Sequence, residues 1–150
     1  MLELEKKYKG IPIKGLKFYQ LLFESEQFTS ELGKMALAAS NLEAKLIMLL
    51  INNKVKGNYQ EAPLGKLIDL AQQSQLLGEN TILALKSLKT QRNYLTHKLY
   101  QLFSYSINET IVERNNLLDS DVLIFTEWAW QLQENLKHLA DIILKEKSEY

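Results

Sequence analysis

The sequence contains no cysteine, only two prolines and two histidines, and no excess of charge of either sign. The absence of cysteine excludes disulfides, thiolate catalysis and cysteine-based zinc sites, and it fits a reducing cytoplasm. Eighteen Lys and Arg residues balance eighteen Asp and Glu residues. No overall field therefore draws the chain to nucleic acid or a membrane surface. Any site for a polyanion must come from a local basic patch.

Neither a membrane span nor a secretion signal is expected from the sequence. No run approaches the roughly 18 consecutive apolar residues of a spanning helix. The first ten residues, MLELEKKYKG, have no apolar run and carry two acids and three lysines, which argues against a signal peptide. A length of 150 residues fits one domain with a substantial core. We expect one cytoplasmic domain, with an N-terminal arm and short helix over 1–24 and a bundle over 25–147.

What the sequence does contain is apolar residues at helical spacing. Gly10, Pro12 and Gly15 predict an irregular arm over residues 9–15. Ser25 predicts the N-cap of a long helix that Gly57 closes. Apolar positions in this helix follow steps of three and four, at Phe28, Leu32, Met35, Ala39, Leu42, Leu46 and Leu49. Gly33 lies inside it, and we expect this glycine to allow close packing of another helix.

Three further helices follow from the same periodicity. Pro63 opens a short one, whose apolar side is Leu64, Leu67, Ile68 and Ala71. The next runs from about Glu79 to Phe103, with a stripe of Leu85, Leu88, Arg92, Leu95, Leu99 and Leu102. The last runs from about Asp121 to Lys147 after a cap at Asp119 or Ser120, and buries Phe125, Trp128, Leu132, Leu136, Leu139 and Ile143. No segment alternates with period two for long enough to form a sheet. The prediction is an all-α antiparallel bundle of three long helices plus one or two short ones.

The third long helix carries an unusual polar cluster. Its basic residues, in a neutral chain, are Lys86, Lys89, Arg92 and Lys98. The residues spaced to share one polar face are Lys89, Asn93, Thr96, His97 and Tyr100. Arg92 stands where this face meets the apolar stripe. His97 follows it by five positions, which is about 140° of rotation and roughly 7.5 Å of rise on an ideal helix. The two side chains would meet only if Arg92 bends round or a second copy of the helix contributes.

Structural explanations of this cluster compete with functional ones. A basic polar face is usually solvated, a single histidine on a helix is usually structural, and an arginine at the border of a core often pairs with an acid. A metal site is disfavoured, because zinc needs three or four ligands and His138 lies on another helix. No catalytic Ser-His-Asp order, phosphate-binding glycine loop or carboxylate pair stands out, and no cofactor is indicated.

The segment RNYLTH, residues 92–97, resembles the signature of the HEPN superfamily. That signature is an arginine, four to six residues and a histidine, often with a polar residue directly after the arginine. Here four residues intervene, and the polar residue is Asn93. The resemblance extends over residues 25–145 through the helical pattern SELGKMALAASNLEAKLIMLLI followed by PLGKLI, but its specific part is RNYLTH. It implies an all-α bundle of about this length.

The resemblance also implies metal-independent cleavage of RNA by a homodimer. RNA carries its own nucleophile, the 2′-hydroxyl, so an enzyme needs a group that moves protons and a group that holds negative charge. His97 would be the general acid or base, and Arg92 would bind the phosphorane. Asn93 would hydrogen-bond the phosphate or orient the imidazole. The product would be a 2′,3′-cyclic phosphate, in a toxin or defence effector held off by an antitoxin.

The neighbouring residues of the helix complete the expected RNA site. They are Lys89, Thr96, Lys98 and Tyr100. In one toxin–antitoxin branch of the superfamily, a tyrosine that the antitoxin modifies lies two positions after the histidine. Leu99 occupies that position here and the tyrosine is Tyr100, so the modification does not carry over. A catalytically silent HEPN-like module that dimerises or binds a partner remains open, as does a helical adaptor with a chance motif. Exposure of Trp130 would favour a partner surface.

Overall fold

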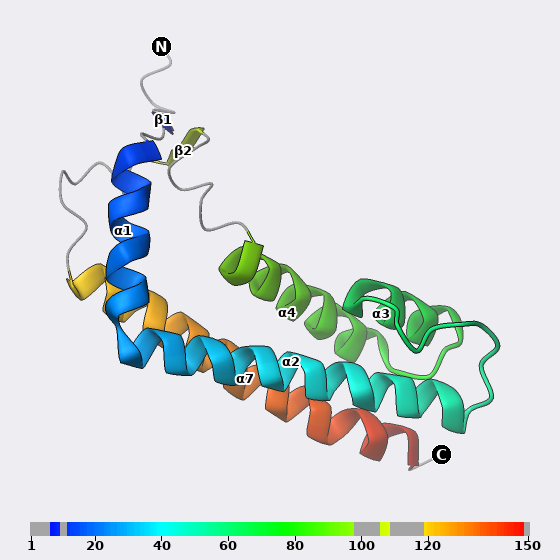
Figure 1. Ribbon diagram of the computed structural model, residues 1–150. Coiled ribbons are helices and arrows are strands. Elements are labelled where there is room, and N and C mark those ends of the chain that lie inside the picture. Colours follow the sequence, from blue (N-terminus) through cyan, green and yellow to red (C-terminus); the bar gives the residue numbers. More distant parts are fainter. Residues whose placement is uncertain (1–6, 10–11, 98–105, 109–118, 149–150) are drawn as a thin grey trace.

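The computed structural model describes residues 7–9, 12–97, 106–108 and 119–148. Its helices are α1 (Pro12–Glu24), α2 (Glu26–Asn52), α3 (Leu64–Gln73), α4 (Glu79–His97) and α7 (Asp119–Ser148) (Figure 1). Two short strands, β1 (Lys7–Lys9) and β2 (Ser106–Asn108), pair with each other. Apart from these two strands of three residues each, the described elements are all helices, so the prediction of an all-α bundle is confirmed.

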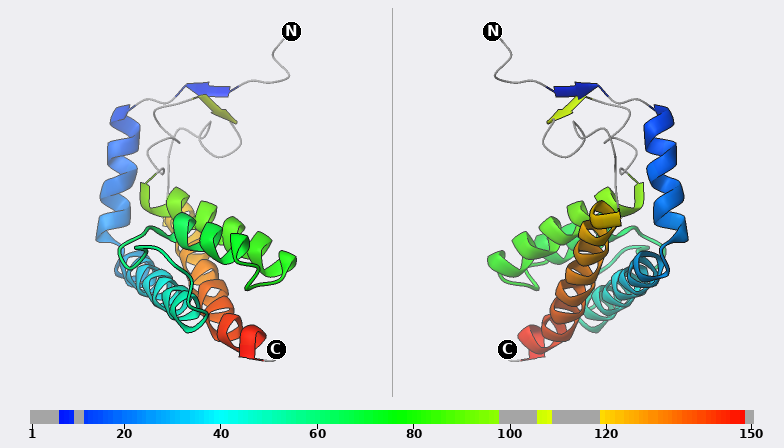
Figure 2. Two further views of the ribbon diagram at one scale, coloured as in Figure 1. Left: turned by 90° about the vertical axis from the view of Figure 1, so that its right-hand side faces the viewer. Right: turned by 90° about the vertical axis from the view of Figure 1, so that its left-hand side faces the viewer.

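Consecutive long helices of the bundle run antiparallel, so α2 and α7 are parallel to each other and α4 opposes both (Figures 1 and 2). The pairing of α2 with α7 shows the shared direction. Lys45 of α2 forms an ion pair of 3.6 Å with Asp141 of α7. Nearer the start of both helices, the side-chain nitrogen of Gln133 donates to Glu31 at 2.8 Å. This is the orientation of the amide in which its nitrogen faces an acceptor and its oxygen faces a donor. The short helix α3 covers α2 and α4 at the end remote from α1 (Figure 1).

The ends of α2 follow from local hydrogen bonds. Ser25 is its N-cap, as predicted, because the Ser25 hydroxyl accepts from the Phe28 N–H at 3.0 Å. The helix ends earlier than the glycine signal indicated, at Asn52. There the Asn53 amide donates to the Leu49 carbonyl at 2.8 Å, and Lys54 takes a left-handed conformation with φ of 55°. Lys54 and Lys56 therefore lie beyond the last turn, and Gly57 belongs to the loop.

The core lies mainly along the seam between α2 and α7. Most of the periodic positions are buried as predicted, including Leu42, Leu46, Leu132, Leu136 and Ile143. Trp128 is a correction: its side chain is 42% exposed, and its neighbour Ala129 takes the buried position. The Trp128 ring packs edge-on against Phe125 with centroids 4.9 Å apart.

Helix α1 is longer than the sequence indicated. The predicted irregular arm over residues 9–15 is wrong from Pro12 onward, because the helix begins at that residue. Proline fits the first turn of a helix, where its missing N–H needs no partner. The helix rises from one end of the bundle (Figure 1) and anchors there through Phe18, whose ring centroid lies 5.4 Å from that of Phe125.

The strand pair lies beside the start of α1, away from the bundle (Figures 1 and 2). It is antiparallel, with Lys7 opposite Asn108, Tyr8 opposite Ile107 and Lys9 opposite Ser106. Period-two alternation cannot be recognised over three residues, so no sequence pattern predicted this pair.

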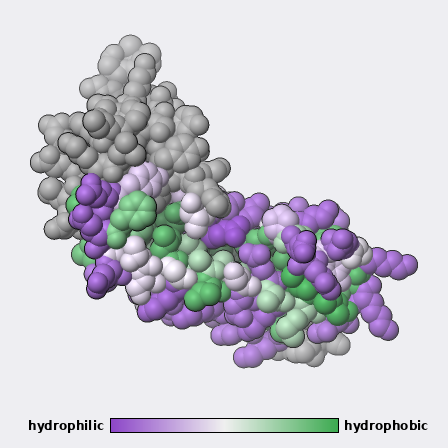
Figure 3. Space-filling model, viewed as in Figure 1, coloured by the Kyte–Doolittle hydropathy of each residue, from purple (hydrophilic) through white to green (hydrophobic). Residues whose placement is uncertain are grey.

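Helix α2 is apolar on two faces. One face is buried against the rest of the bundle, and the other exposes Leu37, Met48 and Ile51, with Ala44 between them. Pale and green surface accordingly appears among the purple in the space-filling view (Figure 3). By its length and composition alone, α2 is long and apolar enough to cross a membrane. Its buried face is what the core of a helical bundle requires.

Gly33, in the N-terminal part of α2, has open space around it rather than a closely packed neighbour, which corrects the sequence expectation. Nothing lies within 4 Å of the position a Cβ would take. We predict that Gly33→Ala raises the free energy of unfolding by about 1 kcal/mol, because alanine has the higher helix propensity. Thermal unfolding should then shift upward by roughly 2–4 °C.

The matched control for this substitution is Gly57→Ala. Gly57 has a φ of 138°, a conformation that alanine rarely adopts, so the same added methyl should lower the melting temperature. Equal shifts in the two variants would contradict the assignment of Gly33 to an unstrained, exposed helix position.

Candidate functional site

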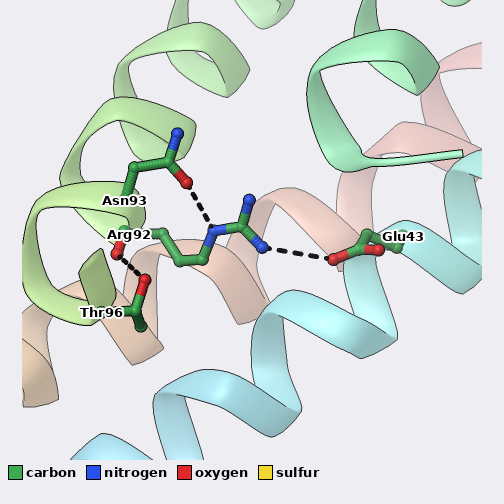
Figure 4. Close-up of polar contacts among 4 residues, drawn as sticks. All are labelled: Glu43, Arg92, Asn93 and Thr96. Carbon is green, nitrogen blue, oxygen red and sulfur yellow. Dashed lines mark hydrogen bonds and ion pairs between the residues drawn. The ribbon is translucent and has the colours of Figure 1, made fainter.

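A cleft of about 200 Å³ opens between α2 and α4. The α2 side of the cleft consists of Ala36, Ala39, Ser40 and Glu43, and the α4 side consists of Arg92 and Thr96. The single arginine and the single glutamate face each other across it (Figure 4). The cleft therefore lies at the start of the RNYLTH segment, where the sequence predicted a site.

Arg92 is the residue that crosses the cleft. Its Nη1 lies 3.5 Å from Glu43 Oε1, and its Nε donates to Asn93 Oδ1 at 3.1 Å (Figure 4). The two charged side chains are 21% and 28% exposed. An ion pair of this length and exposure contributes little to stability, from zero to about 1 kcal/mol. The position of Arg92 on the apolar stripe is explained, because its side chain reaches toward α2, where the carboxylate of Glu43 receives the guanidinium.

Asn93 and Thr96 both contact Arg92, in ways the sequence did not indicate. The Asn93 side-chain oxygen accepts from the guanidinium, so this residue orients the arginine. The Thr96 hydroxyl donates to the Arg92 carbonyl at 2.8 Å, one helical turn back, and its side chain lines the cleft. The cluster of Arg92, Asn93 and Thr96 is thus one connected unit.

Lys86 and Lys89, the other described basic residues of the predicted strip, face α3. Lys86 Nζ donates to Gln72 Oε1 at 2.9 Å. Lys89 lies over the first turn of α3, where a Cβ placed on Gly65 would be 3.3 Å from both its Cδ and its Nζ. Helical spacing keeps Lys89 on the same side of α4 as Asn93 and Thr96, but its stem lies against Gly65 of α3 and does not line the cleft.

His97 is the last residue of α4, four residues after Asn93 in a continuous helix. Its imidazole, and the predicted site residues Lys98 and Tyr100, lie outside the described parts of the chain, as do Leu99 and Leu102 of the predicted stripe. The distance between the His97 side chain and the Arg92 side chain therefore stays a prediction from the helical spacing.

Tyr94 packs at the edge of the core, on the other side of α4 from the cleft cluster. Burial raises the pKa of the Tyr94 phenol above its usual value of 10.0, and Tyr19 nearby raises it further. This tyrosine is half-buried and neutral at physiological pH, as expected for a residue of the packing rather than of the site.

Glu43 is the site residue that the sequence analysis missed. It lies 49 positions before Arg92, on another helix, so no local spacing connects the two. The available signal was indirect: Glu43 follows the buried position Leu42 in the periodic stripe of α2, which places its side chain at the border of the core.

No three His, Asp or Glu side chains gather as metal ligands anywhere in residues 7–9, 12–97, 106–108 and 119–148. What the described cleft offers chemically is a guanidinium with hydroxyls beside it. This arrangement can bind an oxyanion through charge-assisted hydrogen bonds. The hydroxyls belong to Ser40 and Thr96.

The fold and the cleft together define an all-α bundle with an oriented arginine between two of its long helices. Comparison with known proteins adds nothing more particular, because no protein-family model, curated protein or solved structure matches the chain.

Proposed function

We propose that the protein is a metal-independent endoribonuclease of the HEPN type, acting as a toxin or phage-defence effector in the cytoplasm. The observation that supports this proposal is the held guanidinium of Arg92 in an open cleft, five residues before His97 on the same helix. An arginine already oriented by its neighbours needs little reorganisation to stabilise developing charge on a phosphorane.

The proposed reaction uses groups of the chain and of the RNA alone. His97 removes the proton from the 2′-hydroxyl, whose oxygen attacks the adjacent phosphorus. Arg92 binds the non-bridging oxygens as their charge grows, and Asn93 keeps the guanidinium in place. The bond between phosphorus and the 5′-oxygen then breaks, and the protonated His97 gives the proton that it took from the 2′-hydroxyl to this oxygen, leaving a 2′,3′-cyclic phosphate and a 5′-hydroxyl.

A homodimer is part of this proposal. On one α4 helix, His97 lies five positions after Arg92, which is about 140° of rotation. A twofold axis that brings two copies of α4 together would place the arginine of one protomer near the histidine of its partner. An antitoxin protein is the proposed partner that restrains the activity, and neither a cofactor nor a membrane takes part.

Cleavage of mixed RNA by the purified protein in excess EDTA tests the proposed function. Wild type should produce fragments with cyclic phosphate ends, and Arg92→Ala should lower the rate by about 10²–10³-fold, as expected for loss of one oxyanion donor. The control is Lys86→Ala, which removes a positive charge from the same helix but on the side that contacts Gln72 of α3. Its rate should be close to wild type. Intact RNA with folded, unmodified wild-type protein would contradict the proposal.

A second candidate is a catalytically inactive HEPN-like module that dimerises or binds a partner protein. Exposure of Trp130, at 48%, favours this candidate, because large exposed aromatic side chains are enriched at protein interfaces. Under it, wild type and His97→Ala would affect growth of the host equally, and RNA would remain intact in both.

A further inference from the structure

The carboxylate of Glu43 is the feature of the cleft that the proposed reaction does not use. It is the only acidic side chain among the described residues that line the cleft, and it faces the only cationic one. A negative charge here is unexpected at a site for phosphate, since like charges repel. Its presence calls for a role in controlling what the guanidinium binds.

The geometry of Arg92 shows which of its donors remain for a ligand. A guanidinium binds an oxyanion most strongly through two parallel N–H groups, on its side edge (Nε with Nη2) or on its end edge (Nη1 with Nη2). Asn93 accepts from Nε and so obstructs the side edge. The end edge is left, and Glu43 already contacts its Nη1.

The contact between Glu43 and Arg92 is weak enough to yield. Its 3.5 Å separation is well beyond the usual length of a charge-assisted hydrogen bond, which is about 2.7–2.9 Å. Both side chains reach solvent, so the Glu43 carboxylate can rotate into water without being buried unpaired. Arg92 would still be held by Asn93 after that rotation.

The cleft has room for the ligand once the carboxylate moves. A water molecule occupies about 30 Å³ in the liquid, and the cleft volume is about 200 Å³, which accommodates a tetrahedral phosphate group. Ser40 adds a hydroxyl that makes no hydrogen bond within the described chain and is free to donate to such a group.

We propose that Glu43 is an internal competitor that occupies the phosphate-binding edge of Arg92 and is displaced when a phosphate group enters the cleft. This inference rests on the proposed role of Arg92 as a phosphate ligand. Glu43 makes the cleft electrically neutral when no ligand is bound. It also selects against weakly charged ligands, because only an anion that binds the guanidinium more tightly than the carboxylate does can displace it.

Titration of the protein with inorganic phosphate tests this inference, with the Nε–H signal of Arg92 in nuclear magnetic resonance spectra as the readout. An exposed ion pair is worth at most about a factor of five in an equilibrium constant. Since Glu43→Gln also removes repulsion of the anion, we expect its affinity for phosphate to exceed that of wild type by about five- to tenfold. Arg92→Ala should bind no phosphate at the cleft, as judged by the amide signals of Ser40 and Thr96.

The matched control is Asp141→Asn, which neutralises a carboxylate that pairs with Lys45 on the α7 side of α2. Its phosphate affinity should stay at the wild-type value, which separates a local effect from one of net charge. In RNA cleavage, Glu43→Gln should lower KM without lowering kcat.

Two outcomes would overturn the inference. Phosphate affinity in Glu43→Gln that equals or falls below that of wild type would show that the carboxylate positions the arginine instead of competing for it. No phosphate binding by any variant would remove the anion site itself. Tighter phosphate binding by Glu43→Gln without RNA cleavage by any variant would leave the inference standing and contradict only the ribonuclease proposal.

Discussion

Replacing His97 with alanine is expected to abolish toxicity when the protein is produced in a bacterial cell. Positioned acid–base groups typically contribute 10²–10⁴-fold to a reaction rate, so the variant should cleave RNA at least about a hundredfold more slowly. Such a loss turns a growth-arresting enzyme into a nearly harmless protein. Growth curves after induction, with equal amounts of protein verified, measure the effect.

The chain supplies its own control for this experiment. Its only other histidine, His138, is exposed on α7 and takes no part in the proposed reaction. His138→Ala should therefore be as toxic as wild type. If His97→Ala arrests growth as strongly as wild type, His97 is not the proton-transfer group, and the partner-binding candidate gains support.

Replacing Leu46 with alanine is expected to have the largest effect on stability among the substitutions considered. Leu46 is fully buried on the face of α2 that packs against the rest of the bundle. Removing its branched end loses burial and leaves a cavity, at a cost of about 2–5 kcal/mol. Because domains are typically stable by only about 5–15 kcal/mol, the variant should unfold at a much lower denaturant concentration. Denaturant unfolding followed by circular dichroism measures the change.

Met48, two residues further along α2, provides the comparison for Leu46. It is 49% exposed, so Met48→Ala should change stability by no more than about 0.5 kcal/mol. A similar loss in both variants would contradict the placement of the two residues on opposite faces of α2. A loss for Met48→Ala that depends on protein concentration would instead show that the outward apolar face is buried between protomers.

The parts of the fold that the sequence predicted correctly are those governed by local rules. Periodicity identified the buried face of α2, and the Ser25 cap follows from hydrogen bonds within one helical turn. Periodicity is less decisive between neighbouring positions, since steps of three and four both fit a helix. Trp128 and Ala129 are such a case: the sequence favoured the larger residue for the core, whereas the smaller one is buried.

The candidate site shows a similar division. The segment from Arg92 to His97 could be singled out because its residues are near one another in sequence. Its actual environment could not, because Glu43 and Gly65 belong to other helices and nothing local connects them to α4. Glu43 changes the interpretation most, since it makes the cleft neutral where a basic strip had been predicted.

The pairing of β1 with β2 has a consequence for how the chain folds. It joins residues 7–9 to residues 106–108, about 100 positions later. Closing so long a loop has a large entropic cost, and the hydrogen bonds of a six-residue strand pair barely offset it. Helices, by contrast, form from neighbouring residues within about a microsecond. We therefore expect the helices to assemble first and the two chain segments to join last, which makes this ladder the first structure to open when the native state fluctuates.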